Sequence, residues 1–120
     1  MPACLHSALI RFRIGSANSR TIFGVCQTIV PDEAIETDYV MKAILNIKAG
    51  TGKKESEDLL AAAAAHLEAR GAEVLVLGCT EIPLAFNPQR ATVPVVNGTR
   101  VLAEASIRTF QEMSRNKKKR

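Results

Sequence analysis

LGCTEIPL, residues 77–84, lies near the middle of the chain and follows a short apolar run, VLVL. A continuous apolar run of this length, here Val74–Leu77, is typical of a strand buried on both faces. Gly78 lets the backbone turn tightly where the strand ends. Thr80 carries a hydroxyl suited to capping a helix, and Pro83 is tolerated in a first helical turn but not deeper. We therefore expect a strand, a tight turn and then a short helix.

The thiol of Cys79 falls at the carboxyl end of this predicted strand. Free backbone N–H groups and the positive end of a helix dipole meet there, and both favour a thiolate. The thiolate is the reactive form of cysteine, and open α/β sheets bind ligands at the carboxyl ends of their strands. The alternative is a small core residue, since free cysteine is among the most buried residue types.

Two amphipathic helices are predicted before this strand. Asp32 is placed to cap the first helix, which should stop before the flexible stretch Ala49–Gly52. Ser56 is placed to cap the second helix, and Gly71 to end it in a left-handed conformation. Both helices carry an apolar stripe at helical spacing. The stripes are Val40, Ala43, Ile44 and Ile47 in the first helix, and Leu59, Leu60, Ala63 and Leu67 in the second.

Strands and helices alternate along the chain. Thr21–Val30 is rich in β-branched residues and ends at a proline, which indicates a strand. Val93–Val96 is another short apolar run, and Asn97–Thr99 offers a turn and a cap for a last helix over about Arg100–Met113. The alternation predicts an α/β fold, a three-layer Rossmann-like lobe with a mostly parallel sheet. The last helix has a looser apolar stripe, formed by Leu102, Ala105, Ile107 and Phe110.

Composition divides the 120 residues into three parts: a lead-in with the first strand (1–30), an α/β lobe (31–113) and a basic tail (114–120). The net charge of +4 comes from the tail, because residues 1–114 hold 11 basic and 12 acidic side chains, a net of −1. The lobe is therefore not a nucleic-acid-binding surface, and no apolar run is long enough to span a membrane. The tail is either a solvated terminus, a localisation signal, or a contact for nucleic acid or anionic lipid.

The three cysteines, Cys4, Cys26 and Cys79, are odd in number and widely spaced. This spacing argues against a disulfide framework and fits a reducing, cytoplasmic compartment. The alternative is mitochondrial, because residues 1–19 lack acids and carry two arginines, as transit peptides do. Cys4 and a nearby histidine are too few ligands for a metal site, so no metal is expected.

Three stretches of the chain carry a family resemblance. They are PDEAIETDYVMKAILNIKAG (31–50), HLEARGAEVLVLGCTEIPLAF (66–86) and VPVVNGTRVLAEASI (93–107). Together they resemble the second half of the aspartate/glutamate racemase superfamily, whose members work without pyridoxal phosphate. The resemblance is most specific at Gly78-Cys79-Thr80-Glu81. The acidic residue after Cys-Thr resembles the aspartate racemase branch. The glutamate racemase branch usually has a histidine at that position.

The resemblance implies a cofactor-independent amino-acid racemase that acts on aspartate or glutamate. Racemisation removes the α-proton on one face and returns a proton on the other, which calls for two acid/base groups with suitable pKa values. The family uses two cysteines, one in each of two similar lobes. Cys79 matches the catalytic cysteine of the second lobe, and Thr80 the residue that helps hold the substrate carboxylate. Glu81 matches a polar residue beside the thiol, or it simply complements the helix dipole.

Two departures from the family pattern keep two functions open. Family members are about twice as long, and their first lobe, with its own cysteine and an Asn-Thr motif, has no counterpart here. Asn97 also stands where the family tends to have aspartate. The chain is therefore either a racemase that needs a partner lobe or a homodimer to complete its site, or a truncated, non-catalytic module that binds a small molecule or another protein. A redox-sensing thiol is a weaker reading, since Cys79 has no resolving cysteine nearby in sequence.

Overall fold

The structure is a computed structural model and describes residues 9–11, 13–14 and 26–119. The predictions for Cys4 and for most of the acid-free segment lie outside these residues, as does the side chain of Cys26. In chain order the elements are β1 (Leu9–Arg11), β2 (Arg13–Ile14), β3 (Cys26–Gln27), α1 (Glu33–Ile35), η2 (Glu36–Met41), α2 (Lys42–Ala49), α3 (Lys53–Ala69), β4 (Leu75–Leu77), α4 (Ile82–Ala85), η3 (Pro88–Arg90), β5 (Val95–Asn97) and α5 (Gly98–Lys118).

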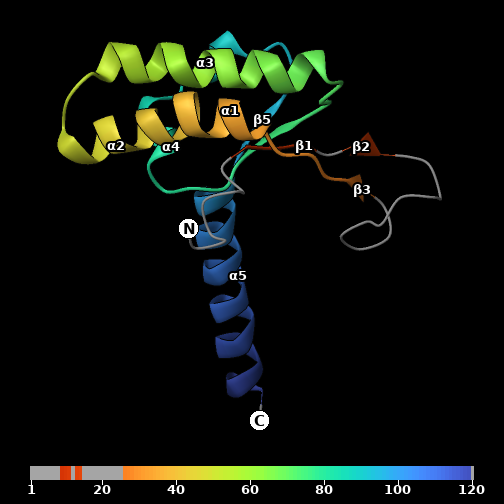
Figure 1. The fold of residues 1–120 in the computed structure, drawn as a ribbon. Helices are drawn as coiled ribbons and strands as arrows, with labels where there is room; N and C mark the ends of the chain where they lie inside the picture. The colour runs from red at the N-terminus through yellow and green to blue at the C-terminus, as the bar shows by residue number, and fades with distance from the viewer. Residues whose placement is uncertain (1–8, 12, 15–25, 120) are drawn as a thin grey trace.

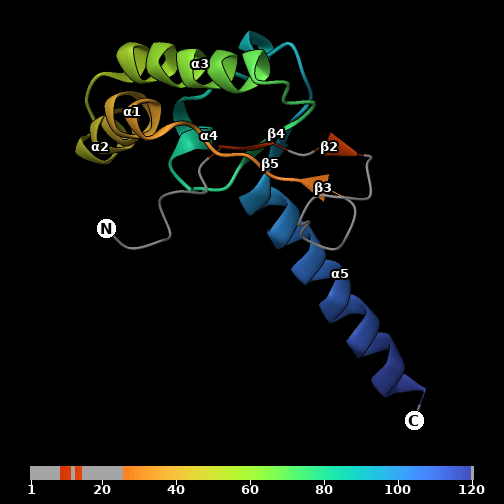
Figure 2. The same cartoon turned by 45° about the vertical axis from the view of Figure 1, so that its right-hand side comes forward.

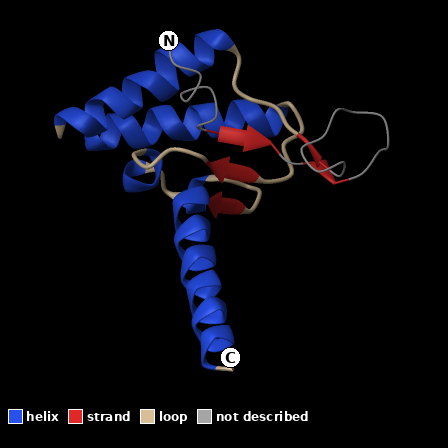
Figure 3. Cartoon of the chain, turned by 90° about the horizontal axis from the view of Figure 1, so that it is seen from below, coloured by secondary structure: helices blue, strands red, loops and turns tan. Residues whose placement is uncertain are grey.

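A small mixed sheet runs through the lobe in the order β1-β4-β5 (Figures 1 and 3). The central strand β4 pairs in parallel with β5 and antiparallel with β1. β2 and β3 form a separate antiparallel pair. The α/β class is confirmed, with parallel pairing between β4 and β5. Of the strand predicted over Thr21–Val30, residues 21–25 lie outside the described part of the chain, and the rest is a strand only at β3.

Two helical segments pack on each other beside the sheet. The segments α1, η2 and α2 run on without a break from Glu33 to Ala49, and α3 lies alongside them (Figure 1). The apolar stripes predicted from spacing meet in this core, where each buried Leu or Ile contributes about 1.5–3 kcal/mol. The core side chains from these helices are Val40, Ala43, Ile44, Leu60, Ala63, Ala64 and Leu67, and those from the sheet and α4 are Leu75, Leu77, Ile82, Ala85 and Phe86.

Two of the predicted helix caps are wrong. The helix α3 begins at Lys53 with Gly52 (φ 57°) before it, so Ser56 lies inside the helix rather than at its start. Two glycines with positive φ, at 50 and 52, reverse the chain in fewer residues than expected. The buried Ser56 hydroxyl faces the Ala43 carbonyl at 3.5 Å. Asp32 precedes α1 but makes no cap bond with its side chain. The cap at Gly71 is confirmed, with φ 88°.

The last helix, α5, projects away from the lobe (Figure 2). Its predicted cap is confirmed, since the Asn97 side chain accepts a hydrogen bond from Arg100 N at 3.1 Å. The helix runs to Lys118, five residues past Met113, and so includes most of the segment predicted as a tail. Its apolar stripe does not pack on the core, because Leu102, Ile107 and Phe110 are all exposed. None of the helices in the described part of the chain is long and apolar enough to cross a membrane.

Candidate active site

Cys79 lies two residues beyond the carboxyl end of β4. At this edge Leu77 pairs with Asn97, so β4 and β5 end side by side. Gly98 makes the close approach possible, because a Cβ there would lie 3.0 Å from the Leu77 carbonyl oxygen. The sheet thus places the thiol at the edge where parallel strands end, as the sequence predicts.

A hydrogen-bonded cluster brings together the three predicted site residues. The Cys79 thiol donates to Glu81 Oε2 at 2.7 Å. The Thr80 hydroxyl donates to the same oxygen at 2.9 Å. The expectation that Thr80 caps α4 is therefore wrong, because its hydroxyl is taken up by the Glu81 carboxylate. Glu81 itself occupies the capping position of α4, without a side-chain cap bond.

The surroundings of the Cys79 thiol favour its protonated form, contrary to the expectation of a thiolate. Burial is the main cause that raises the pKa of Cys79, and the hydrogen bond to the negative Glu81 raises it further. The backbone N–H groups of Glu81 and Ile82 lower the thiol pKa, as expected at a helix start, but they do not prevail. The helix α4 has only four residues, so its dipole is small.

Glu81 is the anion of the cluster. Its pKa is lowered, first by the hydrogen bond from Cys79, then by that from Thr80, and also by the charge of Lys48. Near neutral pH the cluster therefore consists of a thiol that donates and a carboxylate that accepts.

Lys48 is a site residue that the sequence analysis missed. Its Nζ lies 3.8 Å from Glu81 Oε1, and the lysine side chain is 57% exposed. In the sequence it is an ordinary lysine in the last turn of a helix, where cations are favoured. Only the packing of α2 against α4 brings it to the turn that holds the thiol. We call Cys79, Glu81 and Lys48 the thiol site.

The thiol site has an exposed apolar border. Leu45 is 61% exposed and lies three residues before Lys48 on α2, while Leu84 is 69% exposed and lies three residues after Glu81. Residues three apart in a helix share a face, so both leucines lie beside the Lys48–Glu81 ion pair. An open hollow of about 470 Å³ adjoins this border, lined by Ile47, Gly50, Thr51, Gly52, Lys53, Leu84 and Ala85.

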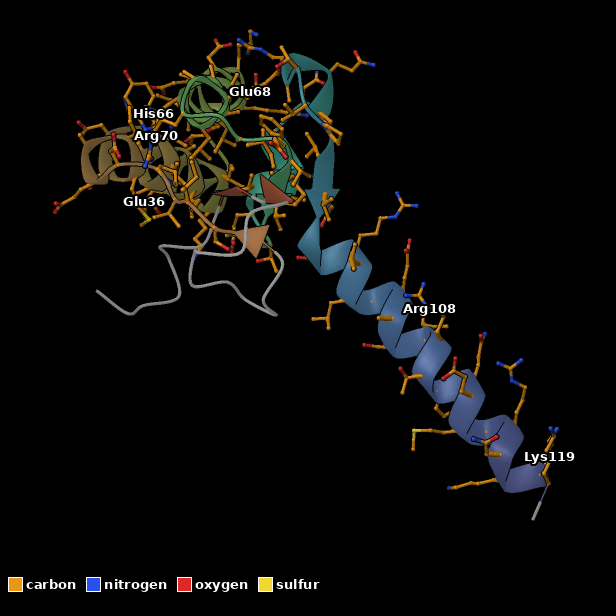
Figure 4. All side chains as sticks on the ribbon, turned by 90° about the vertical axis from the view of Figure 1, so that its right-hand side faces the viewer. Glu36, His66, Glu68, Arg70, Arg108 and Lys119 are labelled. Carbon is orange, nitrogen blue, oxygen red and sulfur yellow. The ribbon has the colours of Figure 1, made fainter. Side chains whose placement is uncertain are left out.

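A second polar cluster, away from the thiol, joins helix ends. His66 Nε2 and Arg70 Nη1 lie 3.3 and 3.1 Å from the two carboxylate oxygens of Asp32. Arg70 also donates to the Val30 carbonyl at 2.7 Å. Figure 4 shows His66 and Arg70 at one side of the lobe, next to Glu36. The cluster accounts for the missing Asp32 cap and fastens the start of α1 to the end of α3.

Among the described residues, no three His, Cys, Asp or Glu side chains come together as metal ligands. The groups around the thiol are one carboxylate, which accepts hydrogen bonds, one hydroxyl and one ammonium group. This set is suited to proton transfer and to holding an anion.

Comparison with known proteins finds a family model and a solved structure that resemble this chain. The family model described as Asp/Glu/hydantoin racemase matches residues 20–106. A crystal structure named as that of a "putative Asp/Glu Racemase" from Yersinia pestis matches with 35% sequence identity and a TM-score of 0.58. The match covers 64% of this chain and 34% of that protein, so the chain spans about a third of its length.

Proposed function

The chain belongs to the Asp/Glu/hydantoin racemase family, and we propose that it supplies half of the active site of a cofactor-independent racemase for aspartate or glutamate. The observation that carries the proposal is the thiol site, where the Cys79 thiol donates to an ionised Glu81 at 2.7 Å. A thiol held in this way is a suitable acid/base group for an α-carbon.

Proton donation is the role that the resting state of Cys79 favours. As the new Cα–H bond forms on one face of the substrate carbanion, the S–H bond breaks and its electron pair stays on sulfur. In the reverse direction the same thiolate takes the α-proton and returns to the thiol. Glu81 remains an anion in both directions and accepts a hydrogen bond whenever Cys79 is protonated.

Recognition of the substrate falls to the groups around the thiol. The Thr80 hydroxyl lies next to the thiol and can turn from Glu81 to a substrate carboxylate. Lys48 places a positive charge 3.8 Å from Glu81 Oε1, which offsets the repulsion between Glu81 and an acidic substrate. An acidic amino acid fits this arrangement better than a neutral one, because Lys48 can pair with its side-chain carboxylate.

The second acid/base group must come from outside the thiol site. Cys79 is the one cysteine whose thiol lies in the described part of the chain. A second lobe, on another chain or on a second copy of this one, would face Cys79 across the substrate. The exposed border formed by Leu45 and Leu84 is a surface that such a lobe, or a helix that it carries, would cover.

The rival function is a non-catalytic module that binds a small dicarboxylate or another protein. It is favoured by the raised pKa of the Cys79 thiol, because a thiol that holds its proton more tightly is less often the base that proton abstraction needs.

Chiral chromatography of aspartate and glutamate incubated with the purified chain separates the two functions. The racemase proposal expects formation of the D-isomer that is lost in Cys79→Ser and retained in Cys4→Ser, which makes the same change at another cysteine. Equal rates for wild type and Cys79→Ser would remove Cys79 from the mechanism. Saturable binding of L-aspartate with no D-isomer would support the module.

A further inference from the structure

The projecting helix α5 presents an apolar face with nothing packed on it. Leu102, Phe110 and Met113 are 69%, 70% and 59% exposed. At 100° per residue their side chains fall within about 80° of one another around the helix, and Ile107, 59% exposed, borders them. Large exposed apolar patches on one face mark interaction surfaces. Figure 4 shows the helix standing clear of the lobe along most of its length.

Charge is divided unequally between α5 and the lobe. Residues 98–119 hold six basic and two acidic side chains, a net of +4. The described residues before α5 (9–11, 13–14 and 26–97) hold eight basic and ten acidic side chains, a net of −2. Arg100 and Glu104 pair with each other at 2.9 Å, so the unpaired excess lies toward the far end of the helix. The helix and the lobe of another copy are therefore complementary in charge.

We propose that α5 is a docking arm that binds the lobe of a second copy of this chain, and that two copies exchange their arms reciprocally. The proposal concerns assembly and stands whether or not the chain racemises an amino acid. The lobe offers Leu45 and Leu84 as exposed apolar partners for the arm. Its acidic character attracts the basic end of the helix.

The size of the contact favours exchange over simple pairing of two α5 helices. A helix of 21 residues is about 31 Å long and about 10 Å wide, and so covers about 300 Å² on each surface it joins. One α5–α5 contact would bury about 600 Å² in total, and two exchanged arms about 1,200 Å². Stable interfaces begin at about 1,200 Å², and two basic helices side by side would repel each other.

Reciprocal exchange of the α5 arms would also bring the second copy to the thiol site. The arm begins at Gly98, directly after the strand residue that pairs with Leu77. Cys79 lies two residues beyond Leu77 on the neighbouring strand. A lobe that packs against the first turns of the arm would lie next to the sheet edge that carries the thiol.

Sedimentation equilibrium of the full chain tests the proposal. Wild type is expected to form dimers at micromolar concentration, and Phe110→Glu to weaken the dimer at least about tenfold, because it buries a charge at the centre of the apolar face. The matched control is Gln111→Glu, which adds the same charge on the polar side and should change the dissociation constant less than about threefold. Circular dichroism verifies that both variants keep their helix. A chain that stays monomeric, or equal weakening by both variants, overturns the proposal.

Salt and cross-linking distinguish the arrangements. Raising salt from about 50 mM to about 500 mM should weaken an arm–lobe dimer, since opposite charges are screened. A dimer that salt strengthens would be an α5–α5 pair, which contradicts exchange.

In a mixture of isotope-labelled and unlabelled chains, carbodiimide should link Lys117 or Lys118 of one chain to lobe carboxylates of the other. Cosedimentation of monomers with phosphatidylserine vesicles, without dimers, would assign the arm to membranes and overturn the proposal.

Discussion

Replacement of Gly98 by alanine should destabilise the chain, although alanine is normally the better helix residue. The added Cβ would lie 3.0 Å from the Leu77 carbonyl oxygen, whereas ordinary contacts begin at 3.4 Å. Leu77 is paired on both sides, with Leu9 and Asn97, so its oxygen has little room to move. Overpacking costs about 1–3 kcal/mol, and the gain from a helical Gly→Ala change is at most about 1 kcal/mol. We expect a net loss of about 1–2 kcal/mol.

Urea unfolding followed by circular dichroism measures this loss directly. The matched control is Thr99→Ala, at the next and exposed position, which should change the free energy of unfolding by less than about 0.5 kcal/mol. The same clash should shift the Leu77–Cys79 segment and change the rate at which iodoacetamide alkylates the thiol. A Gly98→Ala chain as stable as wild type, or more stable, would refute the close approach of α5 to β4 and with it the position of the thiol site.

Three further predictions concern the thiol site and the core. Glu81→Gln should move the pH profile of Cys79 alkylation to lower pH, because the ionised carboxylate helps to raise the thiol pKa; an unchanged profile would contradict the Cys79–Glu81 hydrogen bond. Lys48→Met should move the carboxyl titration of Glu81, followed by carbon NMR, to higher pH, because the lysine charge lowers the pKa of Glu81; the absence of a shift would mean that the ion pair does not form in solution. Leu60→Ala, at a side chain with 0% exposure, should cost about 2–5 kcal/mol in urea unfolding, whereas Leu45→Ala at the surface should cost less than about 0.5 kcal/mol; equal costs would disprove the packing of α3.

Local pattern was enough to predict the framework of the lobe. The run before Gly78 forms β4, the Cys79 turn follows it, and the apolar stripes of the two central helices meet in the core. These features depend on residues close together in sequence, whose spacing of 2 or 3.6 residues shows which face is buried. The left-handed cap at Gly71 was predictable for the same reason.

The errors arose where a polar side chain had a choice of partners. Asp32 and Thr80 were expected to cap helices, but Asp32 pairs with Arg70 and Thr80 donates to Glu81. Ser56 lies inside a helix that starts three residues earlier. In each case the preferred partner becomes available only through the fold or through the conformation of a neighbouring glycine. A sequence pattern identifies a capable side chain but not the partner that it takes.

The electrostatic state of the thiol was likewise beyond the sequence. The motif predicts N–H groups near Cys79, and two of them do lower its pKa. Burial and the neighbouring carboxylate outweigh them, and both depend on how α4 packs. Lys48 was missed because its contact with Glu81 joins two helices 33 residues apart in the chain.

Exchange of the α-proton of L-aspartate in D2O, followed by proton NMR, tests most directly the claim that Cys79 works as an acid/base group at an α-carbon. If Cys79 has this role, the α-proton signal is lost with wild type and with Cys4→Ser, and it persists with Cys79→Ser. Exchange accompanied by racemisation would show that a second acid/base group is in place, and exchange with retained chirality that Cys79 acts alone. Two results would contradict the acid/base role of Cys79. One is an α-proton signal that persists with wild type at concentrations where the chain is dimeric, and the other is a signal that disappears equally fast with Cys79→Ser.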